Sequence, residues 1–351
     1  MFEVRPLLLV IAGVAGLLSA TITAAKSNEP VDVMITPPAS TGLPPTLLPA
    51  YAQRPGQMVD VGGFRLNLYC FGSGSPSVIL EAGAGWGAVA WINIQKKLAE
   101  KAQVRVCSYD RAAMNFSDLG PLGRKPGYEV GDLNALLHEA KIPEPYLLVG
   151  WSAGGVILRR YAYRYPDQVA GLITVDGSTY DFESKPEEPY YSRVLAFLTS
   201  CRDTARRKGF DADSDLFGRC AQTINPLSFV PEMQKPLSNY VRDVGVYERV
   251  LASFERIAAT GAELREMRKP YGDLPLRVIV AGSHFGDAAS DETSITDTAY
   301  VRNSYRLASL STSGRMIVIP NMTHAAHLER PEEVMAVIED VIDVVRQRRA
   351  R

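Results

Sequence analysis

A single serine between two glycines is the first residue of this sequence that could carry chemistry. Residues 146–154 read YLLVGWSAG, so Ser152 directly follows an apolar run and lies between Gly150 and Gly154. Glycine permits backbone conformations that a side chain would block. A G-x-S-x-G between a buried strand and a helix holds the serine hydroxyl clear of the sheet. This context predicts a nucleophilic serine; a small-residue turn that only serves packing is the alternative.

A serine hydroxyl needs a base to take its proton, and histidine is the usual base. The chain has four histidines. His138 lies on the polar side of a helical pattern, which predicts an exposed side chain. His324 lies in the loop NMTHAAHLERPE, directly after the apolar run RMIVIP. Its position at the carboxyl end of a predicted strand makes it our candidate base, and we expect the nearby His327 to support the loop.

The acid that orients the histidine has two candidates. Asp176 ends the run LITVD, the next apolar run after the one that precedes the serine. Asp287 follows the run LRVIVAG in a polar loop, six residues beyond Ala281. The acid must hold one imidazole tautomer and stabilise the imidazolium. We favour Asp176 as the acid, because it ends a buried strand, and keep Asp287 as the alternative. If it is not catalytic, Asp176 would be a structural carboxylate at a strand end. Asp287 would then be a solvated charge in a loop.

Acyl transfer also requires backbone N–H donors for the oxyanion of the tetrahedral intermediate. One donor should be the residue after the nucleophile, Ala153. The other should come from the glycine-rich turn EAGAGWG, residues 81–87. We expect Ala84 to provide it, with Gly83 as the next choice, because glycines let this backbone approach the substrate oxygen.

Two aromatic residues and one charged pair lie close to these motifs. Trp86 and Trp151 could wall a substrate pocket, although ordinary core packing would explain them nearly as well. Asp110 and Arg111 follow the strand-like run VRVCSY. Arginine cannot act as a base, so we interpret this pair as a structural ion pair that ties loops together.

The elements around these residues alternate between strands and helices. Alternation of this kind predicts an α/β fold with a mostly parallel sheet covered by helices on both faces. Apolar patterns predict a hairpin joined by Gly62 and Gly63, and a last helix that carries six apolar residues on one face. The predicted strands are 57–71 as two runs, 77–81, 104–110, 146–150, 171–176, 276–281 and 315–320, and the predicted helices are 88–101, 129–140, 153–165, 298–310 and 334–345.

The chain divides into four predicted parts. Residues 1–25 contain twenty uncharged residues between Arg5 and Lys26, which is typical of a signal peptide or a membrane anchor. Residues 26–56 form a proline-rich linker. Residues 57–180 and 271–351 form the α/β core, and the alternation lapses at 181–270, where we expect a helical lid. The protein should be exported, to the periplasm or the medium, or anchored by its N-terminal segment.

Composition and cysteine usage limit the function further. A net charge of −1 gives no basic surface for nucleic acid. Export would allow Cys201 to form a disulfide with Cys220 across a polar stretch with no obvious core, whereas Cys70 and Cys107 could pair or stay buried thiols. No cysteine spacing indicates a zinc site, and no metal or organic cofactor is implied.

Together these residues resemble the α/β-hydrolase family from about residue 57 to 346, apart from the variable insertion at 181–270. The segments that carry the resemblance are VILEAGAG, CSYDRAAMNFSD, LLVGWSAGG, YPDQVAGLITVDG and THAAHLERPE. Two departures are visible: Trp151 occupies a position where the family often has histidine, and Ala112, Ala113 and Asn115 stand where glycines are common.

The resemblance implies a serine hydrolase that cleaves a carboxylic ester or lactone of a small-molecule acyl substrate through an acyl-enzyme. Members that open epoxides or remove halogens use an aspartate nucleophile, and Ser152 argues against both. An amide hydrolase of the aminopeptidase type is the alternative. A non-catalytic ligand-binding member of the fold is a third possibility, disfavoured by the Ser and His pair.

Overall fold

The computed structural model describes residues 56–125, 127–177, 188–208, 215–224, 242–266, 269–282, 291–320 and 322–350. The predicted N-terminal signal or anchor, 1–25, lies outside these ranges, as does the linker up to residue 55. None of the helices within the described ranges is both long and apolar enough to span a lipid bilayer.

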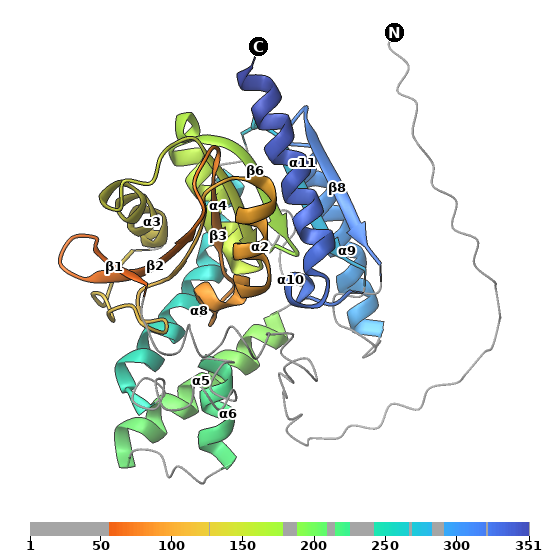
Figure 1. Ribbon diagram of the computed structural model, residues 1–351. Coiled ribbons are helices and arrows are strands. Elements are labelled where there is room, and N and C mark those ends of the chain that lie inside the picture. The colour runs from red at the N-terminus through yellow and green to blue at the C-terminus, as the bar shows by residue number, and fades with distance from the viewer. Residues whose placement is uncertain are drawn as a thin grey trace, which may run out of the picture. The chain divides into compact units, whose positions relative to one another are not determined.

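The strands of the described chain form one sheet of eight in the order β1-β2-β4-β3-β5-β6-β7-β8. Figure 1 shows the strands together with the helices around them. β1 and β2 pair antiparallel, as do β2 and β4, and every other pair is parallel. The predicted mostly parallel sheet is therefore confirmed. The strands are β1 (Gln57–Asp60), β2 (Arg65–Phe71), β3 (Ser77–Glu81), β4 (Val106–Asp110), β5 (Tyr146–Trp151), β6 (Val169–Val175), β7 (Leu276–Ala281) and β8 (Gly314–Ile319).

The predicted hairpin joins β1 to β2. Gly62 and Gly63 both have positive φ values, 109° and 97°. The Asp60 carboxylate accepts hydrogen bonds from both glycine N–H groups, at 2.8 and 2.9 Å. One short turn with two left-handed residues is the expected hairpin connection for twisted strands.

Helices cover both faces of the sheet, because successive side chains of each strand point to opposite faces. On β5, Leu147 and Val149 join one core cluster and Leu148 joins the other. Helices α2 and α11 supply the first cluster, and α3, α4 and α9 supply the second. These helices are α2 (Ile92–Ala102), α3 (Tyr128–Glu139), α4 (Ala153–Arg164), α9 (Asp291–Ala308) and α11 (Pro331–Arg349), with α10 (Ala326–Glu329) and the short 3₁₀ helices η1 (Ala88–Trp91) and η2 (Pro166–Gln168) between elements.

The segment without strand–helix alternation contains three described helices, α5 (Glu188–Lys208), α6 (Asp215–Ile224) and α8 (Val244–Glu266). They have a core of their own, in which Cys201 and Cys220 are fully buried and joined by a disulfide. The sequence suggested no core around these cysteines, and this was wrong: apolar residues of α5 and α6 on either side of the polar stretch form a cluster with residues of α8, which comes later in the chain. Arg249 of α8 donates to the Gly120 carbonyl at 2.7 Å and ties this segment to the loop after β4.

The second pair of cysteines is also oxidised. Cys70 of β2 lies directly opposite Cys107 of β4, and the two form a disulfide. The sequence left open whether these residues pair, and the antiparallel register of the two strands decides it. Two disulfides in one chain fit an oxidising compartment.

Candidate active site

Ser152 occupies the sharp turn between β5 and α4. Its backbone has φ 53° and ψ −122°, a region that residues with a Cβ rarely adopt. The turn is held by the Ser152 N–H, which donates to the Val175 carbonyl at 3.1 Å, and by the Gly155 N–H, which donates to the Ser152 carbonyl at 3.0 Å. The serine therefore stands at the carboxyl end of the sheet with the first turn of a helix behind it.

The two flanking glycines permit close backbone contacts. A Cβ on Gly150 would lie 2.6 Å from backbone atoms of Gly154. A Cβ on Gly154 would lie 2.4 Å from the carbonyl oxygen of Glu81. No side chain fits at either position, so the serine turn can pack against the end of β3 only if both residues are glycine.

His324 and Asp176 meet at the same edge of the sheet. The histidine Nδ1 lies 2.6 Å from Asp176 Oδ2, and the Asp176 side chain is fully buried. The other carboxylate oxygen, Oδ1, accepts a hydrogen bond from the Ala281 N–H at 2.9 Å. A carboxylate can only accept a hydrogen bond, so Nδ1 is the donor in this contact, and a base at this position would have to act through Nε2.

The backbone at His324 is fixed from two sides. The indole N–H of Trp151 donates to the His324 carbonyl oxygen at 2.7 Å. Glu329 accepts hydrogen bonds from the N–H of Thr323 at 2.9 Å and from its hydroxyl at 2.6 Å. Trp151, where the family often has histidine, therefore serves to hold the loop of the candidate base.

His327 supports this loop as a neutral aromatic group. Its side chain is fully buried between Trp91 and Trp151, with ring centroids 4.8 and 4.3 Å away. Neither ring nitrogen has a hydrogen-bond partner among the residues that the structure describes. Burial, together with the nearby His324, lowers the pKa of His327 to about 3. Because it stays uncharged at neutral pH, His327 packs like an apolar ring and cannot replace His324 as a solvent-accessible base.

The glycine-rich turn after β3 lies against the serine. A Cβ on Gly83 would lie 3.2 Å from the Cβ of Ser152 and 2.9 Å from the Trp151 ring. The Trp86 N–H donates to the Gly83 carbonyl at 3.2 Å and closes the turn. Ala84 is half-buried within this turn. Ala153 is the first residue of α4, where N–H groups have no acceptor within the helix.

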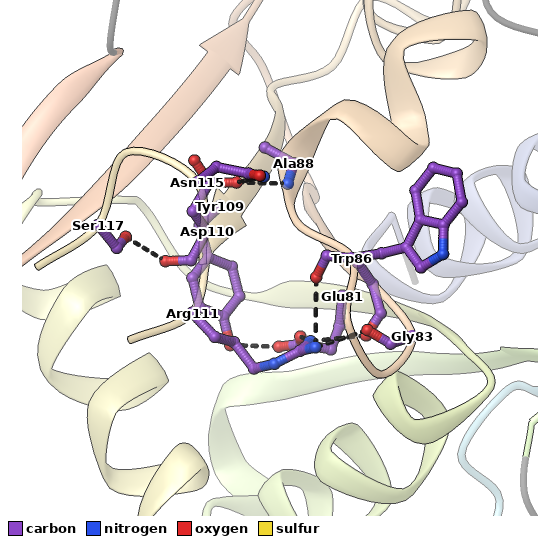
Figure 2. A network of polar contacts seen from close by, with 10 residues as sticks. Glu81, Gly83, Trp86, Ala88, Tyr109, Asp110, Arg111, Asn115 and Ser117 are labelled. Atoms are coloured by element: carbon purple, nitrogen blue, oxygen red, sulfur yellow. Dashed lines mark hydrogen bonds and ion pairs between the residues drawn. The ribbon is translucent and has the colours of Figure 1, made fainter. Parts of the chain in front are cut away.

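A buried ionic network lies behind this turn (Figure 2). Arg111 pairs with Glu81, the last residue of β3, and Tyr109 donates its hydroxyl hydrogen to the same carboxylate. Asp110 instead accepts hydrogen bonds from the Ala88 N–H at 2.8 Å and the Asn115 amide at 2.9 Å. The sequence predicted a structural ion pair of Asp110 with Arg111; the partner was wrong, because the fold places Glu81 of β3 beside the guanidinium.

The structure describes only some of the remaining histidines and carboxylates. The His138 side chain is 81% exposed on α3, which confirms its predicted surface position. Asp287, the alternative acid, and His284 lie outside the described residues. In the described part of the chain, no group of three or more His, Cys, Asp or Glu side chains could hold a metal ion.

A family model described as "Alpha/beta hydrolase family" matches residues 78–337. The chain belongs to the alpha/beta hydrolase family. Among similar proteins, a 2-hydroxy-6-oxo-2,4-heptadienoate hydrolase from Pseudomonas putida is 33% identical over 131 residues, which cover 36% of this chain and 46% of that protein. A pimeloyl-[acyl-carrier protein] methyl ester esterase from Photorhabdus laumondii is 30% identical over 155 residues, which cover 38% of this chain and 56% of the esterase.

Solved structures of this alpha/beta hydrolase fold agree over a longer range. The enol-lactonase from Burkholderia xenovorans LB400 superposes with a TM-score of 0.57 and 20% identity, covering 82% of this chain and all of that one. At this identity the likeness concerns the fold. The matched segment spans about half or less of the length of the first curated relatives.

Proposed function

We propose that this alpha/beta hydrolase is a serine hydrolase that cleaves carboxylic esters, lactones included, through an acyl-enzyme. The hydrogen bond of 2.6 Å between His324 Nδ1 and the buried Asp176 carboxylate carries the proposal. It leaves the other imidazole nitrogen as a proton acceptor at the sheet edge where Ser152 occupies a strained turn. The names of an esterase and a lactonase among the similar proteins support the same bond class.

The reaction would proceed in two halves. The Ser152 oxygen forms a bond to the acyl carbon while His324 Nε2 takes the hydroxyl proton, and Asp176 stabilises the resulting imidazolium. The N–H groups of Ala153 and Ala84 bind the oxyanion. Collapse of the intermediate breaks the acyl–oxygen bond, and the imidazolium returns its proton to the departing alcohol. Water then attacks the acyl-enzyme by the same path and releases the acid and the free serine.

The substrate pocket would be bounded by the half-exposed Trp86 and by the helical segment 181–270, which we propose as a lid. Trp86 packs edge-on against Trp151, with ring centroids 5.7 Å apart. Aromatic walls suit an apolar acyl group. Specificity within the ester class would then depend on the helices α5, α6 and α8.

We also propose that the protein works outside the cytoplasm, by way of its N-terminal segment. The two disulfides support this proposal, because thiols in the cytoplasm are kept reduced. The uncharged run up to residue 25 would serve as the signal peptide or the anchor.

Replacement of Ser152 by alanine tests the proposed function. The wild type should hydrolyse p-nitrophenyl esters and react covalently with a fluorophosphonate probe, and Ser152→Ala should do neither while it keeps its fold. A matched control is Ser108→Ala, which alters a buried serine on β4 that donates to Gln95 away from the turn. Equal labelling of wild type and Ser152→Ala would disprove the assignment, and absence of labelling with tight ester binding would indicate a binding protein.

A further inference from the structure

The network behind the glycine-rich turn fixes the backbone of that turn through one arginine. Arg111 Nη1 donates to the Ala82 carbonyl at 2.6 Å. Nη2 donates to the Gly83 carbonyl at 2.5 Å (Figure 2). Nη2 also lies 3.3 Å from the Trp86 carbonyl. A single guanidinium group therefore binds three carbonyl oxygens of one short turn, together with the Glu81 carboxylate.

These contacts decide which way the N–H groups of the turn point. A trans peptide unit is planar, and its N–H points opposite to its C=O. The Gly83 carbonyl and the Ala84 N–H belong to one peptide unit. When Arg111 holds that carbonyl, the Ala84 N–H points away from the guanidinium, and Gly83 lies against Ser152. The same argument applies to the Ala82 carbonyl and the Gly83 N–H.

The positive charge of the buried Arg111 is balanced by the carboxylate of Glu81. The Arg111 side chain is 9% exposed and the Glu81 side chain is fully buried. Burial raises the pKa of the Glu81 carboxyl, while the positive charge of Arg111 and the Tyr109 hydroxyl act to lower it. A buried guanidinium without a carboxylate partner would be strongly unfavourable. Glu81 therefore allows the cation to stay beneath the turn.

We propose that Arg111 and Glu81 are positioning residues of the oxyanion hole: the arginine fixes the Gly83–Ala84 peptide so that the Ala84 N–H faces the substrate oxygen. This inference rests on the proposed serine hydrolase function. It assigns the pair a role in the rate of acyl transfer, beyond holding β3 and β4 together. Lysine cannot replace the arginine, because an ammonium lacks the planar fork that reaches two neighbouring carbonyls.

The test compares Arg111→Lys and Glu81→Gln with the wild type on p-nitrophenyl butyrate. Loss of one oxyanion donor lowers kcat by about 100- to 1,000-fold in a serine hydrolase. We expect a loss of this order in kcat, KM within about threefold of the wild type, and a parallel loss of affinity for an alkyl trifluoromethyl ketone, which forms a tetrahedral oxyanion on the serine. A purely structural pair would not lower kcat and analogue affinity together.

Arg277→Lys is the matched control. Arg277 is also buried, on β7, where it pairs with Asp340 at 2.7 Å and donates to the Ser313 carbonyl at 3.1 Å. The Arg277→Lys variant should lose thermal stability, as Arg111→Lys should, but its kcat should stay at the wild-type value. If Arg111→Lys does not fold, the kcat of Glu81→Gln tests the positioning role, because glutamine conserves the shape of the glutamate side chain.

The two proposals fail in different ways. An unchanged kcat in a folded Arg111→Lys or Glu81→Gln, beside an active wild type, overturns the positioning role alone. A wild type that neither hydrolyses esters nor reacts with fluorophosphonate overturns the proposed function, and the positioning role with it. Equal losses of kcat in the Arg111 and Arg277 variants would also reject the proposal, since both would then act through general stability.

Discussion

Asp176→Asn is the substitution for which the structure predicts the largest effect with the smallest change in shape. The side chain is fully buried, and its two oxygens have different partners: Oδ1 accepts the Ala281 N–H at 2.9 Å, and Oδ2 faces His324 Nδ1 at 2.6 Å. An asparagine must keep its oxygen toward the Ala281 N–H, because its amide group would otherwise meet another donor. The NH₂ group then faces His324.

This orientation reverses the tautomer of the histidine. An NH₂ group can only donate, so Nδ1 must become the acceptor and the ring proton moves to Nε2. Nε2 can then no longer take the proton of Ser152. The same change in a serine protease lowers kcat by about 10⁴-fold. A factor of 10⁴ corresponds to about 5.4 kcal/mol of activation free energy. The fold should persist, since the Ala281 hydrogen bond is retained.

The assay is kcat on one activated ester for the wild type, Asp176→Asn and Asp287→Asn, with circular dichroism and thermal melting to verify folding. We expect a loss of about 10⁴ in the Asp176 variant, and little change in the Asp287 variant. A mild loss at position 176 beside a severe loss at position 287 would refute the reasoning. The acid would then belong to the loop after β7, and Asp176 would only fix the backbone of Ala281.

Two further predictions concern pH and export. The pKa of His327 is about 3 in the folded chain and about 6.5 when unfolded, so between these values the unfolded state binds the extra proton. The free energy of unfolding should therefore fall by up to about 1.4 kcal/mol per pH unit as the pH drops. In urea unfolding experiments at several pH values, His327→Phe should lack this contribution to the pH dependence of the unfolding free energy. An equal pH dependence in the wild type and the variant would contradict a lowered pKa of the buried His327. The full chain, expressed with its own N-terminus, should leave the cytoplasm with both disulfides formed, and N-terminal sequencing should find a start near Lys26 if the segment is cleaved. A reduced cytoplasmic protein that retains Met1 would contradict export.

The sequence determined the fold class and the position of the candidate nucleophile and base, because both depend on local patterns. Gly150 and Gly154 flank Ser152 at a strand–helix junction, and the structure explains both glycines, because a Cβ at either position would lie less than 3 Å from backbone atoms. His324 follows an apolar run, and the carboxyl ends of parallel strands meet at one edge of the sheet. Periodicity and strand ends are properties of short segments, which is why they can be recognised without knowledge of long-range contacts.

Only the tertiary structure decided which distant groups meet. Asp176 could be compared with Asp287 only by position in the sequence, whereas its contact with His324 joins residues 148 apart. The Glu81–Arg111 pair and the opposed cysteines of β2 and β4 also depend on strand order and register. The neighbour and the register of each strand depend on how the whole sheet is packed and buried. The sequence of a single segment therefore does not show which distant residues it will contact. The chemistry of each side chain comes from the sequence, and its partner comes from the packing of the complete chain.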